Sequence, residues 1–321
     1  MPPSASPDGR RISASGLAGA AISAAIATTL LLLLPWDEVR HLWGEVSPLA
    51  LLAAAGTIAV GHVATGFRIK TMVPAGVAIT LRDGVLVSLW HGCAMIALPV
   101  RLGELALVEA LSRYARVGRA VGLAVLLVQR VYDALLACAA VALGAYGTML
   151  GRAPTALVAA AVVGLLALAR WLDPILGWLA SRCAALPVAP LRRLERLLRD
   201  TRTGVQSTSQ RTPILILGAL LFWATEFAAL WLVFRAFGTS LGPFTTSFLA
   251  AGLALVYALP LPTIGGLGLA ESGLAALLIV AGWPTEVAVG LGVSARVALL
   301  ALHAIVVALL LPTFALTRSA A

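Results

Sequence analysis

The sequence predicts an all-α membrane protein that crosses the bilayer several times. The 321-residue chain contains only 12% charged residues, and its mean hydropathy is +0.98. A soluble domain carries roughly 25% charged residues. Apolar runs of about 20 residues recur along the chain, and each is long enough to cross a hydrocarbon core as a helix. Two of these runs are interrupted by proline and glycine, which indicates helices that break at membrane depth.

The uninterrupted apolar runs define the predicted spans, which are residues 16–35, 47–66, 118–147, 154–172, 212–236 and 285–316. The first follows a polar, basic tail (residues 1–15) and ends in Leu-Pro-Trp. Because a cleaved signal peptide has a shorter apolar region and a small-residue cleavage site, we expect this span to be retained. The interrupted segments are 84–112 and 244–282.

Loop charge predicts the orientation, because basic residues mark the cytoplasmic side. Residues 37–45 are mainly acidic and are expected outside, whereas residues 68–82 carry Arg68, Lys70 and Arg82 and are expected inside. The linker 172–211 is rich in arginine. Within it, LRRLERLLRD (191–200) places leucines on one helical face, which is typical of a helix on the membrane surface; a solvated connector is the alternative. Both termini are expected in the cytoplasm, at the inner cell membrane.

The same charge rule predicts two re-entrant helical hairpins. If residues 84–100 crossed the bilayer, the arginines that follow would lie outside. We therefore expect 84–112 to enter from the cytoplasm, break at Pro99 and return, and 244–282 to do so from the opposite side. Each half (16–147 and 154–316) then has three spans and one hairpin, and the two halves have inverted topology.

A repeated motif supports the inverted halves. ALPVRLGE (97–104) resembles ALPLPTIGGLGLAE (258–271), and each glutamate precedes an arginine by a similar spacing: Glu104 and Arg130, Glu271 and Arg296. Inverted repeats with broken helices are a transporter architecture that places the ligand site where the helix ends converge.

The second motif predicts a turn followed by a helix. Pro260 and Pro262 are expected to end one half-helix, and a new one is expected to begin near Leu269, with Glu271 in its first turn. Glycines between them permit a tight turn or close approach to a ligand; they are Gly265, Gly266 and Gly268. An acid within the membrane costs about 2.5–3.5 kcal/mol, so Glu271 is expected to be paired or functional.

The predicted substrate-binding residues are Arg101, Glu104, Arg130, Asp133, Gly265, Gly266, Glu271 and Arg296. Arg101 is either a phosphate ligand or an arginine that snorkels at the membrane edge. Arg130 and Asp133 lie three residues apart and can form an internal ion pair instead. Arg296 needs a partner from outside its own helix, either Glu271 or a lipid phosphate.

Three acids are candidates for proton coupling: Glu104, Glu226 and Glu271. Glu271 is alternatively a structural cap. Glu226 lies in the middle of a span between Trp223 and Trp231, so it must face protein or water, and it has Arg130 and Arg296 as possible partners.

The remaining polar residues predict no cofactor, no metal and no nucleic-acid partner. The single lysine, Lys70, does not follow a Gly-rich loop, so ATP hydrolysis through a P-loop is excluded. The histidines lack metal-ligand spacing, and the three cysteines are scattered in apolar contexts. The net charge of +9 is explained by basic loops on the cytoplasmic side.

Three motifs resemble the lysylphosphatidylglycerol synthase transmembrane region, a flippase-like membrane domain: RLGE (101–104), QRVYD (129–133) and LPTIGGLGLAE (261–271). The resemblance implies movement of lipid between leaflets. In full-length synthases this domain is fused to an aminoacyltransferase domain, which this chain lacks, so aminoacylation is not expected. The chain departs from the family at Gln129, where an acid is common, and at Ala106-Leu107, where an arginine is common.

The sequence thus favours a transporter, and not an enzyme, that moves an anionic or polyprenyl-linked lipid between leaflets. Arginines would hold the headgroup while the tails stay in the bilayer, and alternation of the halves would expose the site to either leaflet. One alternative is an intramembrane enzyme acting on a lipid-linked phosphate or sugar. Another is an accessory subunit that binds a lipid-synthesis enzyme through residues 172–211.

Overall fold

The computed structural model describes residues 28, 32, 34–74, 77–98, 100–147, 163, 171–185, 189–209, 212–258, 263 and 266–316. Within these ranges the chain forms helices and no strands. Four helices are long and apolar enough to cross a membrane: Pro48–Met72, Arg119–Ala145, Pro213–Ala236 and Thr285–Phe314. The prediction of an all-α polytopic membrane protein is therefore confirmed. The predicted tail 1–15 and most of the predicted spans 16–35 and 154–172 lie outside the described residues.

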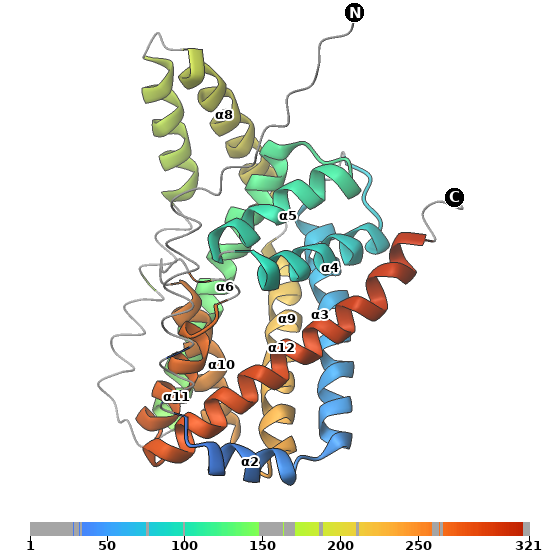
Figure 1. The fold of residues 1–321 in the computed structure, drawn as a ribbon. Helices are drawn as coiled ribbons and strands as arrows, with labels where there is room; N and C mark the ends of the chain where they lie inside the picture. Colours follow the sequence, from blue (N-terminus) through green and yellow to red (C-terminus); the bar gives the residue numbers. More distant parts are fainter. Residues whose placement is uncertain are drawn as a thin grey trace, which may run out of the picture.

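The described residues form a series of helices. They are α2 (Trp36–Gly44), α3 (Pro48–Met72), α4 (Leu81–Ala97), α5 (Val100–Tyr114), α6 (Arg119–Gly147), α8 (Ala189–Ser209), α9 (Thr212–Ala236), α10 (Pro243–Ala258), α11 (Leu269–Val280) and α12 (Thr285–Leu316). Residues 171–184 are also helical. In Figure 1, α3 and α9 run lengthwise, α12 crosses the molecule diagonally, and α8 projects at one end.

Local sequence determines where α3 and α4 begin. The Ser47 hydroxyl accepts a hydrogen bond from the backbone N–H of Ala50 at 3.4 Å, and Pro48 occupies the first helical position, where its missing N–H does no harm. At α4, Thr80 and Asp83 form a capping box: each side chain accepts from the backbone N–H of the other at 3.1 Å.

Two helical hairpins occupy the predicted interrupted segments. α4 ends at Ala97 and α5 begins at Val100, so the helix breaks at the predicted place, and the two helices pack on each other. α10 ends at Ala258 and α11 begins at Leu269, again as predicted, and these helices also pack together. Pro99, Pro260 and Pro262 themselves lie outside the described residues.

Each hairpin also packs on the last long helix of the other half. α10 lies against α6, where Gly144 meets the backbone of Phe248. α4 lies against α12, where Val85 and Leu89 form an apolar cluster with Val307. α4 and α10 therefore each pack on a long helix that is distant in sequence.

Buried apolar side chains form two main clusters toward opposite ends of the long helices. On α3, for example, Ile58 belongs to one cluster and Ile69 to the other. The buried polar side chains His62 and Arg68 lie between those two positions. α6 and α9 likewise contribute to both clusters and carry polar residues in between. The fold thus encloses a polar layer between two apolar ones.

Three sequence expectations require correction. Arg68 was expected in a cytoplasmic loop, but α3 continues to Met72 and buries it completely, because its guanidinium finds a partner inside the bundle. Residues 37–45 were expected to form a loop, yet 36–44 form α2. The linker 172–211 was expected to hold one short helix, whereas 171–184 and 189–209 are both helical, and Val205 of α8 is buried in an apolar cluster with α6 residues.

Candidate functional site

Four charged residues from three helices meet near the first hairpin and are named here the α5–α6 cluster: Arg68, Glu104, Arg130 and Asp133. Arg130 Nε lies 3.3 Å from Glu104 Oε2, across the α5–α6 contact. Arg130 Nη1 lies 3.5 Å from Asp133 Oδ2, and Arg68 Nη1 lies 2.7 Å from Asp133 Oδ1. Asp133 therefore bridges two guanidinium groups.

Arg68 is the innermost residue of this cluster, with a side chain that is 0% exposed. Its Nη2 donates a hydrogen bond to the carbonyl oxygen of Gln129 at 3.0 Å, and its guanidinium lies 5.5 Å from the centre of the Phe222 ring. A buried charge requires such pairing. Sequence reasoning missed this residue because it sits at the end of an apolar run, two residues before Lys70, in the manner of a loop marker.

The second hairpin forms a matching arrangement, the α11–α12 cluster, made of Tyr257, Gly268, Glu271 and Arg296. Arg296 Nε lies 4.0 Å from Glu271 Oε1, and these side chains are only 12% and 6% exposed. The second carboxylate oxygen, Oε2, accepts a hydrogen bond from the backbone N–H of Gly268 at 2.6 Å. The Arg296 guanidinium also lies 5.4 Å from the centre of the Tyr257 ring, a cation–π contact.

The turn before α11 depends on glycine. Gly266 and Gly268 adopt φ angles of +74° and +83°, in the left-handed region that favours glycine. A Cβ atom at Gly266 would collide with the ring of Tyr257. The turn therefore holds Tyr257 against Arg296 and presents the Gly268 N–H to Glu271. Gly265 lies outside the described residues.

Glu226 of α9 connects the two clusters electrostatically. Its carboxyl interacts with Asp133 of the α5–α6 cluster and with Arg296 of the α11–α12 cluster. It also interacts with His303 of α12, whose ring lies 6.3 Å from that of His62. The sequence predicted Glu226 to face protein or water, with Arg130 or Arg296 as its partner, and the structure places Arg296 in electrostatic range.

Several buried polar atoms around these clusters have no hydrogen-bond partner among the described residues. They are His62 Nε2, Gln129 Oε1, Trp223 Nε1, Thr263 Oγ1 and Ser294 Oγ. Buried polar groups in proteins are almost always hydrogen-bonded. These atoms are therefore available to a polar ligand within the bundle. Gln129 and Thr263 lie within the QRVYD and LPTIGGLGLAE motifs, whereas no motif marks His62, Trp223 or Ser294.

The structure thus brings together most of the predicted binding residues. Glu271 meets Arg296 and Arg130 meets Asp133, two pairings that the sequence offered, and Glu104 also meets Arg130, which was not predicted. Arg101 lies in the first turn of α5. No group of three metal-ligating side chains occurs in the described part of the chain.

Two hollows lie outside the charged clusters. One, of about 380 Å³, lies between α9 and the start of α10 and is mainly apolar, with lining residues Phe227, Ala228, Trp231, Leu241, Pro243 and Thr246. The other, of about 430 Å³, lies between the first turn of α6 and α8 and contains arginines.

A comparison with known protein families found a matching family. The family described as the lysylphosphatidylglycerol synthase TM region matches residues 16–307, which include both hairpins and both charged clusters. Comparisons with curated proteins and with solved structures found no match. The match covers nearly the whole sequence and agrees with the motifs around Glu104, Arg130 and Glu271. The chain belongs to the lysylphosphatidylglycerol synthase transmembrane region family, whose members are membrane proteins related to lipid handling.

Proposed function

We propose that this protein is a flippase-like transporter that moves a lipid with a phosphate-containing headgroup between leaflets. The substrate class is an anionic phospholipid or a polyprenyl-linked lipid. The observation that carries the proposal is that each hairpin presents a glutamate to an arginine of the next long helix: Glu104 to Arg130 and Glu271 to Arg296. Glu226 in the interior interacts electrostatically with Arg296 of one pair and with Asp133, which contacts Arg130 of the other.

Inverted-topology halves are the architecture that best explains this pairing. α4 corresponds to α10 in the repeat and α6 to α12, and the packing of α10 on α6 mirrors the packing of α4 on α12. α3 and α9 correspond to each other and pack together at the centre. Re-entrant hairpins in such a fold place polar groups near the midplane. Both termini would lie on the cytoplasmic side of the inner membrane.

The charged pairs suggest how a headgroup is exchanged. Guanidinium groups bind phosphate bidentately. Arg296 Nε and Glu271 Oε1 are 4.0 Å apart, beyond hydrogen-bond distance, so a phosphate can replace this carboxylate at Arg296 without breaking a hydrogen bond between these two side chains. A displaced carboxylate with no cation beside it favours its protonated form. Protons are thus the ion to which transport would be coupled, through Glu271, Glu104 or Glu226.

The surroundings suit a substrate that keeps its tails in the bilayer. The hollow between α9 and α10 is lined by Phe227, Trp231 and Leu241 and can hold an acyl chain. It lies on the same helix as Glu226. The headgroup would lie among the buried charged residues, and the tails would lie along the apolar hollow between α9 and α10.

Reconstitution into liposomes tests the proposal. Movement of fluorescently labelled phosphatidylglycerol and of a labelled polyprenyl phosphate is measured for the wild type, Glu271→Gln and Arg296→Ala. Each substitution is expected to lower the rate at least tenfold. Glu45→Gln and Arg40→Ala, at side chains that are 74% and 78% exposed, are matched controls and should keep the wild-type rate.

Two results would overturn the proposal. One is movement of either lipid at the wild-type rate in both site variants. The other is well-folded wild-type protein that moves neither lipid, which would instead favour an enzymatic or accessory role.

A further inference from the structure

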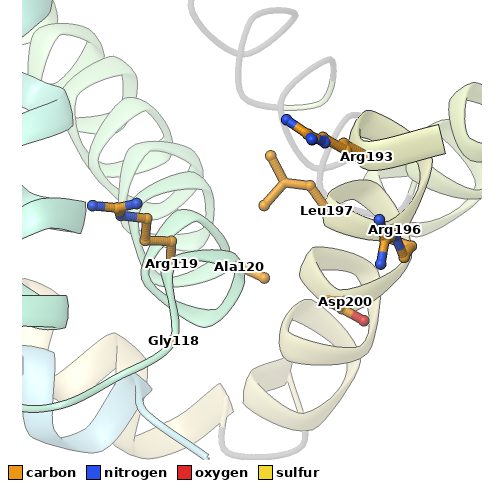
Figure 2. Close-up of a pocket in the computed structure, with 7 residues that line it drawn as sticks. All are labelled: Gly118, Arg119, Ala120, Arg193, Arg196, Leu197 and Asp200. Atoms are coloured by element: carbon orange, nitrogen blue, oxygen red, sulfur yellow. The ribbon is translucent and has the colours of Figure 1, made fainter. Parts of the chain in front are cut away.

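The pocket between α6 and α8 is a basic site that is separate from both charged clusters. It measures about 430 Å³ and is lined by Gly118, Arg119, Ala120, Arg193, Arg196, Leu197 and Asp200. Figure 2 shows Arg193 and Leu197 projecting from α8 toward the side on which α6 lies, while the Arg119 side chain points away from α8.

The arginines of this pocket differ from the other arginines of α8 in their pairing. Arg199 lies 2.7 Å from Glu195, and Arg202 forms a fork with Asp173. Arg193 and Arg196, by contrast, have no ion-pair partner in the part of the chain that the structure describes. α8 carries five arginines and only two acids, so its charge is not balanced from within. Two guanidinium groups on adjacent turns are thus available for an anion.

The α6 side of the pocket adds backbone groups. Gly118 precedes the first turn of a 29-residue helix, and a Cβ there would meet nothing within 4 Å, so the approach is open. The first-turn N–H groups of a helix lack intrahelical partners and carry partial positive charge. Arg119 is bound to Glu109 through Nε at 3.1 Å and Nη2 at 2.9 Å, which turns its guanidinium out of the pocket. The anion ligands are therefore Arg193, Arg196 and this helix start.

Exposed apolar side chains beside the pocket indicate that the anion belongs to a lipid. The helical segment 171–184 is tied to α8 through Asp173 and Arg202. It exposes large apolar side chains along one face: Trp171, Ile175, Trp178 and Leu179. On α8 itself Leu194, next to Arg193, is 42% exposed. Tryptophan and arginine on an amphipathic element are typical of the membrane interface.

We infer that the α6–α8 pocket binds the phosphate of an anionic phospholipid at the membrane surface, as a site distinct from the proposed transport path. Arg193 and Arg196 bind the phosphate oxygens. The Asp200 carboxylate, at the rim of the same pocket, accepts a hydrogen bond from a headgroup hydroxyl and disfavours a multiply charged anion. A phosphatidylglycerol-type headgroup, with one phosphate charge and free hydroxyls, fits this set of groups.

Native mass spectrometry of the full chain in detergent tests the inference. Phosphatidylglycerol, phosphatidylcholine or inorganic phosphate is added, and the bound fraction is measured for the wild type, Arg193→Ala/Arg196→Ala and Arg192→Ala/Arg199→Ala. The last variant removes the same charge from the same helix outside the pocket. The pocket variant is expected to lower phosphatidylglycerol affinity roughly tenfold or more, since it removes two charge-assisted contacts to the phosphate. The control variant should change it less than threefold.

Three outcomes would overturn the inference. Equal losses in both variants would show a diffuse charge effect without a site. An unchanged pocket variant would show that these arginines do not bind the lipid. Inorganic phosphate that binds the wild type as tightly as the lipid, and displaces it, would assign the pocket to a soluble anion. Unfolding midpoints of both variants, measured in parallel, separate a binding effect from misfolding.

Discussion

Arg68 places its guanidinium in the interior of the bundle, where among the described residues it contacts Asp133, the Gln129 carbonyl and the Phe222 ring. Arg68→Ala would leave Asp133 buried with one cation fewer, so we expect a loss of about 3–5 kcal/mol in the free energy of unfolding. Thermal unfolding in detergent measures it. Arg40→Ala, which removes a surface pair with Asp37, is the control and should change stability by less than about 1 kcal/mol. Equal effects of the two substitutions would contradict a structural role for the buried charge.

The surroundings of Gly266 leave no room for a side chain at this position. Gly266→Ala would have to keep φ at +74° and would press on Tyr257. We expect a loss of about 1–2 kcal/mol from the backbone alone and slower lipid movement, because Tyr257 lies beside Arg296. Gly242→Ala, where a Cβ meets nothing within 4 Å, is the matched control. A Gly266→Ala protein with normal stability and transport would rule out a role for this turn.

At the residue scale, the sequence predicted pairs better than it predicted isolated groups. The pairing of Glu271 with Arg296 could be foreseen because Arg296 has no acid nearby in its own helix, and that of Arg130 with Asp133 because the two lie three residues apart. The contact between Glu104 and Arg130 was not predicted. Arg68 and His303 could not, because neither belongs to a motif and no local pattern distinguishes a buried polar residue from one at a helix end. Their positions follow from packing between helices that are distant in sequence.

At the scale of elements, the contact between residues 171–184 and α8 depends on one carboxylate. Asp173 accepts from Arg202 Nε at 2.7 Å, from Arg202 Nη2 at 3.0 Å and from Gln206 Nε2 at 2.8 Å. The hydrogen bonds from Arg202 lower the pKa of Asp173 below its ordinary value of 3.8. A carboxyl with a lowered folded-state pKa stabilises the fold above its ordinary pKa and ceases to do so as the pH falls through the lowered value.

We therefore expect α8 to loosen from residues 171–184 as the pH falls below about 3.8, the ordinary pKa of this carboxyl. Amide hydrogen exchange of residues 189–209, corrected for the intrinsic pH dependence, measures this change. Asp173→Asn should show the loosened state at neutral pH and no further change on acidification. An identical pH response in the wild type and the variant would assign the effect to another group.

The sequence predicted the hairpin elements closely and the 172–211 region poorly. Proline and glycine marked the breaks before Val100 and Leu269 because they disfavour helix locally. The leucine period identified the start of α8. Its last turns, with Thr201, Gly204 and Thr203, have weak helix propensity and are helical because Thr201 and Val205 pack against other helices. Such stabilisation from tertiary contacts is not visible in a local pattern.

At the scale of the molecule, the contact between α6 and α10 joins the two halves, and it requires the absence of a side chain at Gly144. A Cβ there would lie 2.7 Å from the backbone oxygen of Phe244 and from the backbone nitrogen of Phe248. We expect Gly144→Ala to destabilise the protein by about 1–3 kcal/mol through overpacking, as measured by the thermal midpoint. Helix propensity alone predicts the opposite sign, since alanine is favoured over glycine in a helix. Gly56→Ala in α3, where nothing lies within 4 Å, should show that stabilising sign.

Hydropathy predicted four long helices that the structure confirms, although α3 extends to Met72, beyond the predicted residue 66, and the predicted spans 16–35 and 154–172 lie mostly outside the described residues. It gives no information on which helices meet. The exchange of hairpins between halves, with α4 on α12 and α10 on α6, arises from small residues and complementary apolar surfaces at crossing points. Those determinants are single residues spread over the chain, so the pairing of α3 with α9 at the centre also had to come from the structure.

Because α12 runs diagonally across the molecule, it contacts both hairpins. In the first half of α12, Arg296 lies beside Glu271 of the α10–α11 hairpin. In its second half, Val307 packs on α4 of the α4–α5 hairpin. The Phe314 carbonyl accepts a hydrogen bond from Arg82 of α4 at 3.0 Å. Phe314 lies 18 residues beyond Arg296, about 27 Å along a helix. A tilt of about 10° around Arg296 would therefore carry Phe314 by about 5 Å. If α12 moves as one body, we expect a change at the Glu271–Arg296 pair of the second hairpin to shift the contacts of α12 with α4 of the first hairpin.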